Sequence, residues 1–552
     1  MVSTQGVYIL QEVGKNISDE HLSKFLAFLI VIFKELNPEY FRINKKGRRR
    51  VYPHHEMLGL HFWGDINGKV SCREKEEICE GTDEKVKMLI SGFPKKSQIN
   101  DFRNANKELI KEFDSFIVEF CLIIGMVDAT EFVGDGTFLD GNCNDFKALY
   151  PDEIEYVKKF LTEQEKYKKD YELLYNHYYL NEESTDEFIA VKKELKYHVN
   201  IYGIELIIKA LENDAVYKEV MAKLENMSEN ITKDNVKVSI VDPDAHLMKG
   251  KDNNWGFHYN LQEITDPKYG IIVDHYVTKE PNDSREIKKI VTRLIEKFRH
   301  EGFIGSFDNG YFNIELLKEI INETCVELAI PDTQTANITK EKLKNRNYSD
   351  ERYEKRLEEK KKKSKKRTFI DIKDFIYHDD KDAFECPVMH YFLEFQRIIT
   401  DSKDIEYREY WTDKCKTCPH HDECTSQKKR VIRTINEPEI IHIRKFYESP
   451  QGQEAYAKRA PYGEGGFALL LYVRNFRGIR VRGIENVDLE LTRFITQHNI
   501  LKMYTNIDII VLKKVLQYIK AQKKTRRATM DMLWELQGNF IEKDGKIIDV
   551  LI

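Results

Sequence analysis

Hydrophobic residues in the first quarter of the chain recur at the spacing of an α-helix. From residue 18 to about residue 127, apolar runs of this kind alternate with short polar turns. The densest run, from Phe25 to Phe33, is too short to cross a bilayer, and it lacks the basic start and small-residue cleavage site of a signal peptide. We therefore expect a buried helix there, within a helical N-terminal domain that spans residues 1–128.

Short apolar runs typical of β-strands follow, and helical patterns separate several of them. The predicted strands begin at Glu131, Val236, Gly256, Gly270, Phe303 and Val326. Strands that alternate with helices favour an α/β fold built on a mixed sheet. We expect residues 129–150 and 233–334 to form this core.

The segments between and after these parts have a different composition. Residues 152 to about 230 are rich in Glu, Lys, Tyr and Leu, without proline after Pro151, which predicts a helical insertion of two or three long helices over residues 151–232. Charged residues crowd positions 340–367, and they open a segment that spans residues 335–449. The last core helices are expected in residues 450–504, and a helical tail in residues 505–552.

The composition allows several domains without revealing a partner. The chain has 552 residues, of which 41% are hydrophobic and 33% are charged, and its formal net charge is −5. This length corresponds to roughly three or four domain-sized units. Nine cysteines in a long chain without a signal peptide argue against a disulfide framework. These features favour a cytoplasmic protein with no membrane segment.

Basic residues are bunched, although the net charge is small. The bunches are Lys45 to Arg50, Lys360 to Arg367, Lys428 to Arg430 and Lys523 to Arg527. Bunched cations matter more than the total charge for binding phosphate groups. The alternative for each bunch is a solvated surface, which is the usual role of a charge run.

The first basic bunch lies among short predicted helices. Ser97 is placed to cap a helix that presents Asn100, Arg103 and Asn104. Short helices with turns and clustered cations favour a DNA-binding domain of the helix-turn-helix kind. The predicted DNA contacts in this domain are Arg48, Arg49, Arg50 and Arg103. An all-helical oligomerisation domain is the alternative.

Four cysteines in the segment 335–449 have spacings typical of a zinc site. Cys415 and Cys418 are two intervening residues apart, and Cys386 and Cys424 lie within reach. The pattern predicts a structural zinc site with a closed, non-catalytic set of four cysteines. His390, His420 and His421 are candidate substitutes, and reduced thiols in a loop are the alternative.

Three carboxylates are candidates for a catalytic metal site. Asp135 and Asp308 fall at predicted strands, and Glu464 follows Pro461 at a predicted helix start. Phosphoryl transfer on DNA uses two divalent ions, and hard oxygen ligands suit Mg²⁺. Spacing alone does not establish such a site, because the chain has 93 acidic residues.

Several motifs occur together in a fixed order. They are Tyr52-Pro-His, Ser71-Cys-Arg73 and Ser97 to Arg103; Val133-Gly-Asp135-Gly-Thr137 with Gly141-Asn-Cys-Asn144; Asp242-Pro-Asp-Ala-His246; Phe307-Asp308-Asn-Gly-Tyr311; and Tyr456, Arg459, Glu464, Phe476-Arg477, Arg482-Gly483 and His498-Asn499. In this order and spacing the chain resembles a DDE transposase of bacterial insertion sequences. The likeness includes an N-terminal transposase domain and a DDE catalytic domain interrupted by a four-cysteine knuckle.

The resemblance implies a fold, a reaction and partners. The fold is a ribonuclease-H-like core of mixed sheet behind the helical DNA-binding domain, with the helical insertion and the zinc knuckle. Asp135, Asp308 and Glu464 would hold two Mg²⁺ or Mn²⁺ ions, and Arg459, Arg474, Arg477 and Arg482 would contact DNA. The reaction is cleavage of a phosphodiester at the element's end by water, followed by attack of the freed 3′ hydroxyl on target DNA.

The implied partners are double-stranded DNA, as terminal inverted repeats and as target, and a second copy of the chain on that DNA. The implied place of action is the bacterial cytoplasm, in association with the nucleoid. One departure from the family pattern is Leu471, because similar sequences usually carry a lysine there, and Gly465-Gly466 is also unusual. Asn142, Asn144 and Tyr311 are candidates for supporting the site, with packing or turn roles as the alternative.

Three other functions remain open at this stage. A metal-dependent DNA endonuclease would cut without joining strands. A domesticated DNA-binding protein would use the basic helical domain and the knuckle without catalysis. A zinc-stabilised scaffold would not bind DNA, so it would lack the steep salt dependence of a phosphate-binding protein.

Overall fold

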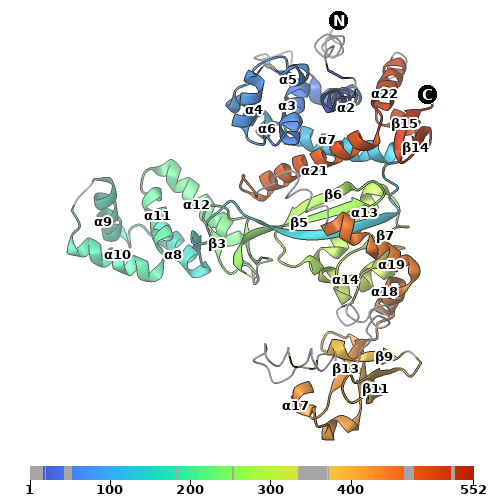
Figure 1. Ribbon diagram of the computed structural model, residues 1–552. Coiled ribbons are helices and arrows are strands. Elements are labelled where there is room, and N and C mark those ends of the chain that lie inside the picture. Colours follow the sequence, from blue (N-terminus) through green and yellow to red (C-terminus); the bar gives the residue numbers. More distant parts are fainter. Residues whose placement is uncertain are drawn as a thin grey trace. The chain divides into compact units, whose positions relative to one another are not determined.

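The computed structural model describes most of the chain. The described residues are 17–42 without 19, 52–180 without 82, 183–250, 254–332, 358, 370–464 without 371 and 379, 478–523 and 529–552. The chain divides into two compact units (Figure 1). Unit 1 comprises residues 1–129, 135–281 and 461–552, and unit 2 comprises residues 130–134 and 282–460.

The N-terminal part of unit 1 is helical, as the hydrophobic pattern predicted. Its α-helices are α2 (Leu22–Leu36), α3 (His54–Ile66), α4 (Cys72–Glu80), α5 (Glu84–Leu89), α6 (Lys96–Ala105) and α7 (Lys107–Ile123). The apolar run that starts at Phe25 lies within α2 and is almost fully buried, which confirms the predicted buried helix. Among the described residues, no helix is long and apolar enough to span a bilayer.

The predicted cap of α6 is wrong. Ser97 lies inside the first turn of the helix, and Lys95 occupies the N-cap position. The backbone N–H of Lys95 donates to the side chain of Gln98 at 2.9 Å. A glutamine three residues after the N-cap therefore stabilises the start of the helix, whereas the sequence argument considered only the hydroxyl of Ser97.

The C-terminal part of unit 1 packs against the N-terminal helices. Helix α21 (Ile484–Asn506) lies along α7 and strand β6, and α22 (Ile509–Gln522) lies against α2. A short helix α23 (Asp531–Trp534) and a hairpin of β14 (Phe540–Lys543) and β15 (Lys546–Val550) follow. The predicted helical tail therefore also contains two strands.

The helical insertion has its own core. It consists of α8 (Pro151–Thr162), α9 (Lys168–Tyr179), α10 (Asp186–His198), α11 (Ile201–Ala210) and α12 (Asp214–Glu229), with the paired strands β2 (Ala148–Leu149) and β3 (Val238–Ser239) at its ends. The prediction of two or three long helices was wrong. The side chains of Asn200 and Asn213 accept hydrogen bonds from the first turns of α11 and α12, so these asparagines start new helices.

The sheet is mixed, as predicted. In unit 1, β5 (Trp255–Asp266) pairs antiparallel with β4 (His246–Lys249) and β6 (Ile271–Thr278), and β1 (Glu131–Asp140) neighbours β5. In unit 2, the first residues of β1 pair parallel with β7 (Ile304–Ser306), which pairs parallel with β8 (Glu327–Ala329). Strand β1 thus lies between the antiparallel strands and the parallel strands of the sheet. A mixed sheet of this kind is consistent with a ribonuclease-H-like core.

Unit 2 also contains helices and a second sheet. The described α-helices are α13 (Ile287–Phe298), α14 (Ile314–Glu323), α17 (His421–Cys424), α18 (Pro438–Glu448) and α19 (Pro450–Ala457). The antiparallel sheet has the order β13-β12-β11-β10-β9 and is built from β9 (Ile376–His378), β10 (Ala383–Glu385), β11 (Phe392–Thr400), β12 (Glu406–Trp411) and β13 (Val431–Ile435). The sequence analysis predicted the cysteine segment here but not its strands.

Candidate functional site

Asp135 lies on a buried part of β1, and the residue before it explains how the strand packs. A Cβ atom on Gly134 would lie 2.2 Å from the Phe307 ring, which is closer than any real side-chain contact. Only glycine therefore permits this approach of β1 to the Phe307 ring. Asp135 itself is 8% exposed. The Val-Gly-Asp sequence thus combines a close backbone approach with an almost buried carboxylate.

Asp308 lies two residues after the end of β7 and is half-buried. Its carboxylate accepts a hydrogen bond from the backbone N–H of Gly310 at 2.8 Å. The side chain of Asn309 donates to the Pro331 carbonyl, also at 2.8 Å. Tyr311 is fully buried and its ring centroid lies 5.1 Å from that of Phe307. The turn after β7 is therefore fixed on both sides, and Tyr311 has a packing role.

The two aspartates follow the paired residues of β1 and β7 at the same distance along the sequence. Val133 is opposite Ser306 in the parallel pairing of β1 and β7. Asp135 follows Val133 by two residues, and Asp308 follows Ser306 by two residues. Because side chains on a strand alternate between faces, Asp135 lies on the same face of β1 as Val133, whereas β7 ends at Ser306, before Asp308.

A buried glutamate on β5 was missed by the sequence analysis. Glu263 is 2% exposed, and its Oε2 has no hydrogen-bond partner among the described residues. Burial, and secondly the negative charge of Asp135, raise the pKa of Glu263 to about 8. The carboxyl group is therefore mostly protonated at neutral pH. The sequence held one sign of this residue, because Glu263 is an acidic residue within a predicted strand.

The third predicted carboxylate is only partly described. Glu464 is the last residue of a short π-helix, Ala460–Glu464, which follows α19, whereas the sequence analysis placed it at a helix start. Its side chain and residues 465–477 lie outside the described part of the chain. This range includes Leu471, Arg474 and Arg477. The assignment of the Asp135, Asp308 and Glu464 triad therefore stays a prediction.

The four predicted zinc ligands lie in one part of unit 2. Cys386 and Cys424 are buried in the cluster that packs the second sheet, and Cys415 and Cys418 are half-buried. Burial raises the pKa of the Cys424 thiol to about 12, and the other three cysteines act on it electrostatically in the same direction. Burial also raises the pKa of Cys386, while the backbone N–H groups of Met389 and Val388 oppose this shift.

The alternative histidines are engaged with carboxylates. His390 contacts Glu385 through Nδ1 at 2.7 Å, and His420 contacts Glu423 at 2.9 Å. Across the described ranges, no three or more His, Cys, Asp or Glu side chains are arranged so that they could hold a metal ion. The zinc site therefore stays a prediction, carried by the proximity and chemistry of the four cysteines.

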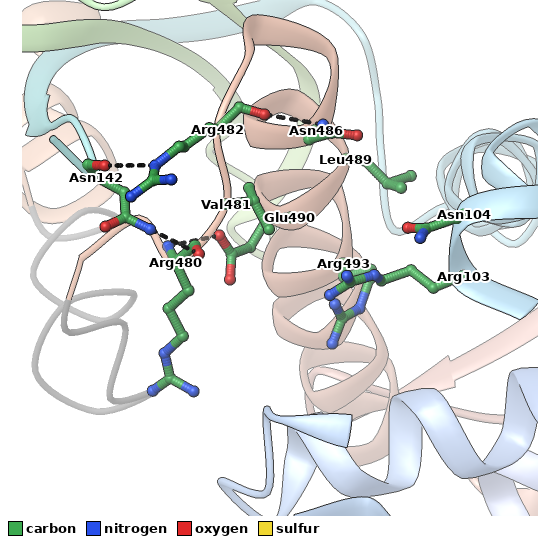
Figure 2. Close-up of a pocket in the computed structure, with 10 residues that line it drawn as sticks. All are labelled: Arg103, Asn104, Asn142, Arg480, Val481, Arg482, Asn486, Leu489, Glu490 and Arg493. Atoms are coloured by element: carbon green, nitrogen blue, oxygen red, sulfur yellow. Dashed lines mark hydrogen bonds between the residues drawn. The ribbon is translucent and has the colours of Figure 1, made fainter. Parts of the chain in front are cut away.

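The predicted DNA-contacting arginines have different environments. Arg459 is half-buried, and its guanidinium lies 5.8 Å from the centroid of the Tyr456 ring. Arg103 on α6 and Arg482 before α21 line one pocket of about 480 Å³ in unit 1 (Figure 2). The structure thus brings together two residues that were predicted from segments far apart in the sequence. Arg48, Arg49 and Arg50 lie outside the described residues.

Other residues of the closing motif are structural. Asn499 accepts a hydrogen bond from the Ile272 N–H at 2.9 Å and donates to the Ile272 carbonyl at 2.8 Å. His498 contacts the carbonyl of Gly270 at 3.1 Å. These bonds fix α21 along β6. Asn144 accepts from the N–H of Phe146 at 2.8 Å, which is a turn role.

Comparison with known proteins gives one match. Residues 386–504 match the family model described as a transposase DDE domain. No curated protein and no solved structure matches the chain. The matched segment contains the cysteine cluster, Glu464 and most of α21. Over these residues the chain is similar to a transposase DDE domain, which supports a transposase-type function in general.

Proposed function

We propose that this chain is the DNA transposase of an insertion sequence, which binds the ends of its element and catalyses DNA strand cleavage and strand transfer. The match to the transposase DDE domain supports the class of reaction. The observation that carries the proposal is the equivalent placement of Asp135 and Asp308, each two residues beyond the paired residues Val133 and Ser306. Glu464, inside the matched segment, is the third member of the proposed triad.

The donor set of this triad fits the proposed cofactor. Mg²⁺, or Mn²⁺ in its place, prefers carboxylate oxygens, and Asp135 on β1 and Asp308 in the turn after β7 supply them. When bound, two such ions would activate the attacking oxygen and stabilise the leaving oxygen of the phosphodiester. Asp135, Asp308 and Glu464 are the residues that would hold them.

Neighbouring residues position the carboxylates. Gly134 allows β1 to approach Phe307, and the Asn309 and Gly310 contacts fix the backbone next to Asp308. Glu263 carries its proton at neutral pH because its pKa is raised by burial and by Asp135. Glu263 therefore adds no second full negative charge beside Asp135. Such a charge would disfavour ionisation of the Asp135 carboxyl group.

The proposed DNA contacts are arginines near Glu464 and arginines of the N-terminal region. Arg459, Arg474, Arg477 and Arg482 come from the segment that contains Glu464, so DNA contacts there would bring the strand to the triad. Arg48, Arg49, Arg50 and Arg103 would bind the terminal inverted repeats through the N-terminal helices. Two element ends must be handled together, and a homodimer on the DNA is the simplest assembly that provides this.

The experiment is cleavage of DNA that carries the gene's own flanking sequences, in the presence of Mg²⁺ or Mn²⁺. We expect cuts at the flanks with wild type and a loss of at least about 1,000-fold with Asp308→Asn, because one oxygen ligand charge is removed. Asp404→Asn is the matched control in unit 2, since Asp404 is exposed and asparagine tolerates its left-handed backbone (φ 62°). Equal cleavage by Asp308→Asn and wild type would refute the triad.

Strand joining separates the transposase from its closest rival. A transposase joins the cleaved end to target DNA, whereas a metal-dependent endonuclease leaves only cut fragments. Binding of the flanks without cleavage under either metal would instead favour a DNA-binding protein.

We also propose that Cys386, Cys415, Cys418 and Cys424 hold a structural zinc ion. Four cysteine thiolates are a common ligand set of structural Zn²⁺ sites, and the mutual electrostatic influence of these cysteines supports their closeness. We expect about one zinc per chain by elemental analysis, and its loss with a lower melting temperature in Cys418→Ser. Cys325→Ser, at an exposed cysteine of the same unit, should keep the metal. A zinc-free wild type with normal stability would refute this site.

A further inference from the structure

The pocket of about 480 Å³ in unit 1 is built from three separate segments (Figure 2). Arg103 and Asn104 come from α6, Asn142 comes from the turn after β1, and the remaining lining residues lie between Arg480 and Arg493. Four of its ten lining residues are arginines, and one, Glu490, is acidic. A volume of this size is within the range of about 300–1,000 Å³ of ligand-binding pockets.

Hydrogen bonds hold the backbone that forms one wall of the pocket. Asn142 donates from Nδ2 to the Arg480 carbonyl at 2.8 Å and accepts at its own carbonyl from Arg482 Nε at 2.9 Å. Asn486 donates to the Arg482 carbonyl at 2.8 Å. The following residue, Gly483, is anchored by a hydrogen bond to Asp242 at 3.0 Å. The backbone that carries Arg480 and Arg482 is therefore preorganised.

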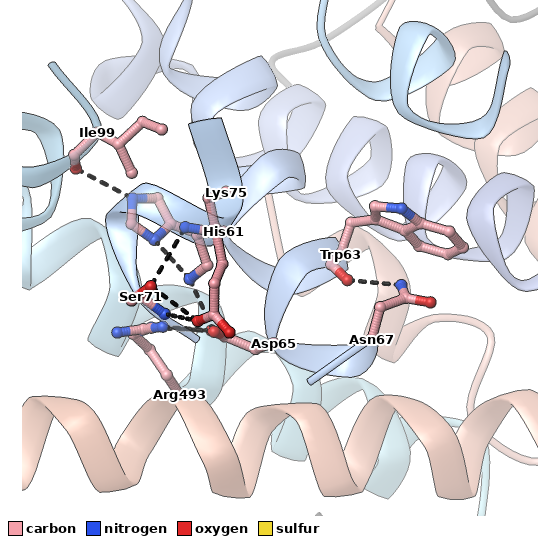
Figure 3. Close-up of polar contacts among 9 residues, drawn as sticks. His61, Trp63, Asp65, Asn67, Ser71, Lys75, Ile99 and Arg493 are labelled. Carbon is pink, nitrogen blue, oxygen red and sulfur yellow. Dashed lines mark hydrogen bonds and ion pairs between the residues drawn. The ribbon is translucent and has the colours of Figure 1, made fainter. Parts of the chain in front are cut away.

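The charge of one arginine is compensated inside the protein. Arg493 is 2% exposed and forms a forked contact with Asp65, including Nε to Oδ2 at 2.9 Å (Figure 3). Lys75 binds the same carboxylate at 2.7 Å. Arg493 is thus a structural residue at the base of the pocket.

The charges of the other three arginines are not compensated in this way. Within the described residues, Arg103, Arg480 and Arg482 form no ion pair with a carboxylate; Arg103 donates to the neutral Asn100 amide. Glu490 is buried, and its carboxylate accepts the backbone N–H of Arg480 at 3.1 Å. Burial raises the pKa of Glu490, against the charges of Arg493, Arg480 and Arg103. The lining thus contains one acidic residue and three arginines beside the paired Arg493, so the pocket is electropositive.

We propose that this pocket binds a phosphodiester group of a DNA strand, with Arg103, Arg480 and Arg482 as the ligands. This inference rests on the proposed function and deepens it, because it assigns Arg480, which the sequence analysis did not predict, and joins it to Arg103 in one site. Guanidinium groups pair with phosphate oxygens by charge-assisted hydrogen bonds. The pocket is larger than one phosphate group needs, which leaves room for the adjoining sugar.

The experiment measures DNA affinity of the full chain from about 50 to 200 mM salt, because each lost phosphate contact lowers the salt slope by about one. Arg480→Gln is the main variant, since it removes the charge while the backbone N–H still reaches Glu490. Arg103→Gln is the second variant, from a different element. Lys218→Gln is the control, because Lys218 is an exposed cation on α12 outside the pocket. Circular dichroism confirms that each variant folds.

We expect each arginine variant to weaken binding about tenfold and to lower the slope by about one, with no change in the control. Wild-type slopes in both variants would overturn the pocket assignment while leaving the proposed function intact. A wild type that does not bind DNA would overturn both. Calorimetry with inorganic phosphate tests the other source of the same chemistry. If phosphate binds the wild type but not Arg480→Gln, and the DNA slopes do not change, the site takes a free anion rather than DNA.

Discussion

The arginines on and before α21 differ in whether a carboxylate of the protein neutralises their charge. Arg493 is buried and paired with Asp65, in a network that also contains Lys75 and His61 (Figure 3). Arg480 and Arg482 are exposed and form no ion pair with a carboxylate within the described part of unit 1. A buried arginine needs a nearby carboxylate to neutralise its charge. A solvent-exposed arginine without such a partner remains available to an external anion. Burial therefore separates the structural arginine from the candidate ligands.

The buried network is arranged so that every member has a partner. His61 contacts the Ile99 carbonyl through Nε2 at 3.3 Å and Lys75 through Nδ1 at 3.3 Å. Since the ammonium of Lys75 can only donate, Nδ1 accepts and the proton is on Nε2. Burial lowers the pKa of His61 well below its ordinary value, so the ring is neutral. The network links α3 and α4 to α21.

The largest effect is expected where the buried pairing is broken. Asp65→Asn leaves both Arg493 and Lys75 in the interior without a countercharge. We expect a loss of about 3–5 kcal/mol in the free energy of unfolding, measured by urea denaturation. A loss below about 1 kcal/mol would show that the interior is hydrated and that the contrast with the open arginines is wrong.

A smaller effect is expected in how the free energy of unfolding depends on pH through Lys75. Burial, and then the charge of Arg493, lower the pKa of Lys75 to about 8, below the value of about 10.4 in an unfolded chain. The unfolded state therefore binds more protons between pH 8 and about 10, so the contribution of Lys75 to stability rises with pH in this window. The difference in unfolding free energy between wild type and Lys75→Met should grow from pH 8 to 10. A constant difference would contradict the shift.

The smallest effect is expected for an exposed ion pair. Lys169 and Glu187 lie 3.2 Å apart, and their side chains are 73% and 65% exposed. Glu187→Gln should change the unfolding free energy by less than about 0.5 kcal/mol in the same denaturation assay. If it instead matched the loss in Asp65→Asn, burial would not be the property that distinguishes these pairs.

The sequence predicted the elements better than it predicted their contacts. The helical N-terminal region, the strand that carries Asp135 and the strand before Asp308 were predicted because their periodicities are local properties. Glu263 was missed because its environment depends on β1, which is more than a hundred residues away along the chain. Arg493 was missed for the same reason, since its partner Asp65 belongs to α3.

The insertion shows another limit of periodicity. Its helices were predicted as two or three long ones, but caps such as Asn200 and Asn213 divide them. An asparagine inside an amphipathic pattern favours a helix start only when the chain turns there. Likewise, only the three-dimensional structure shows that Arg103, Arg480 and Arg482 line the same pocket.

The most direct test of the central claim is metal rescue at Asp308. The account predicts that Asp308→Cys does not cleave the flanking DNA with Mg²⁺ and regains measurable cleavage with Mn²⁺, because the softer ion accepts a sulfur ligand better. The control Asp404→Asn should cleave with both ions. Cleavage by Asp308→Cys at the wild-type rate in Mg²⁺ would contradict a role of Asp308 as a metal ligand, and with it the proposed triad.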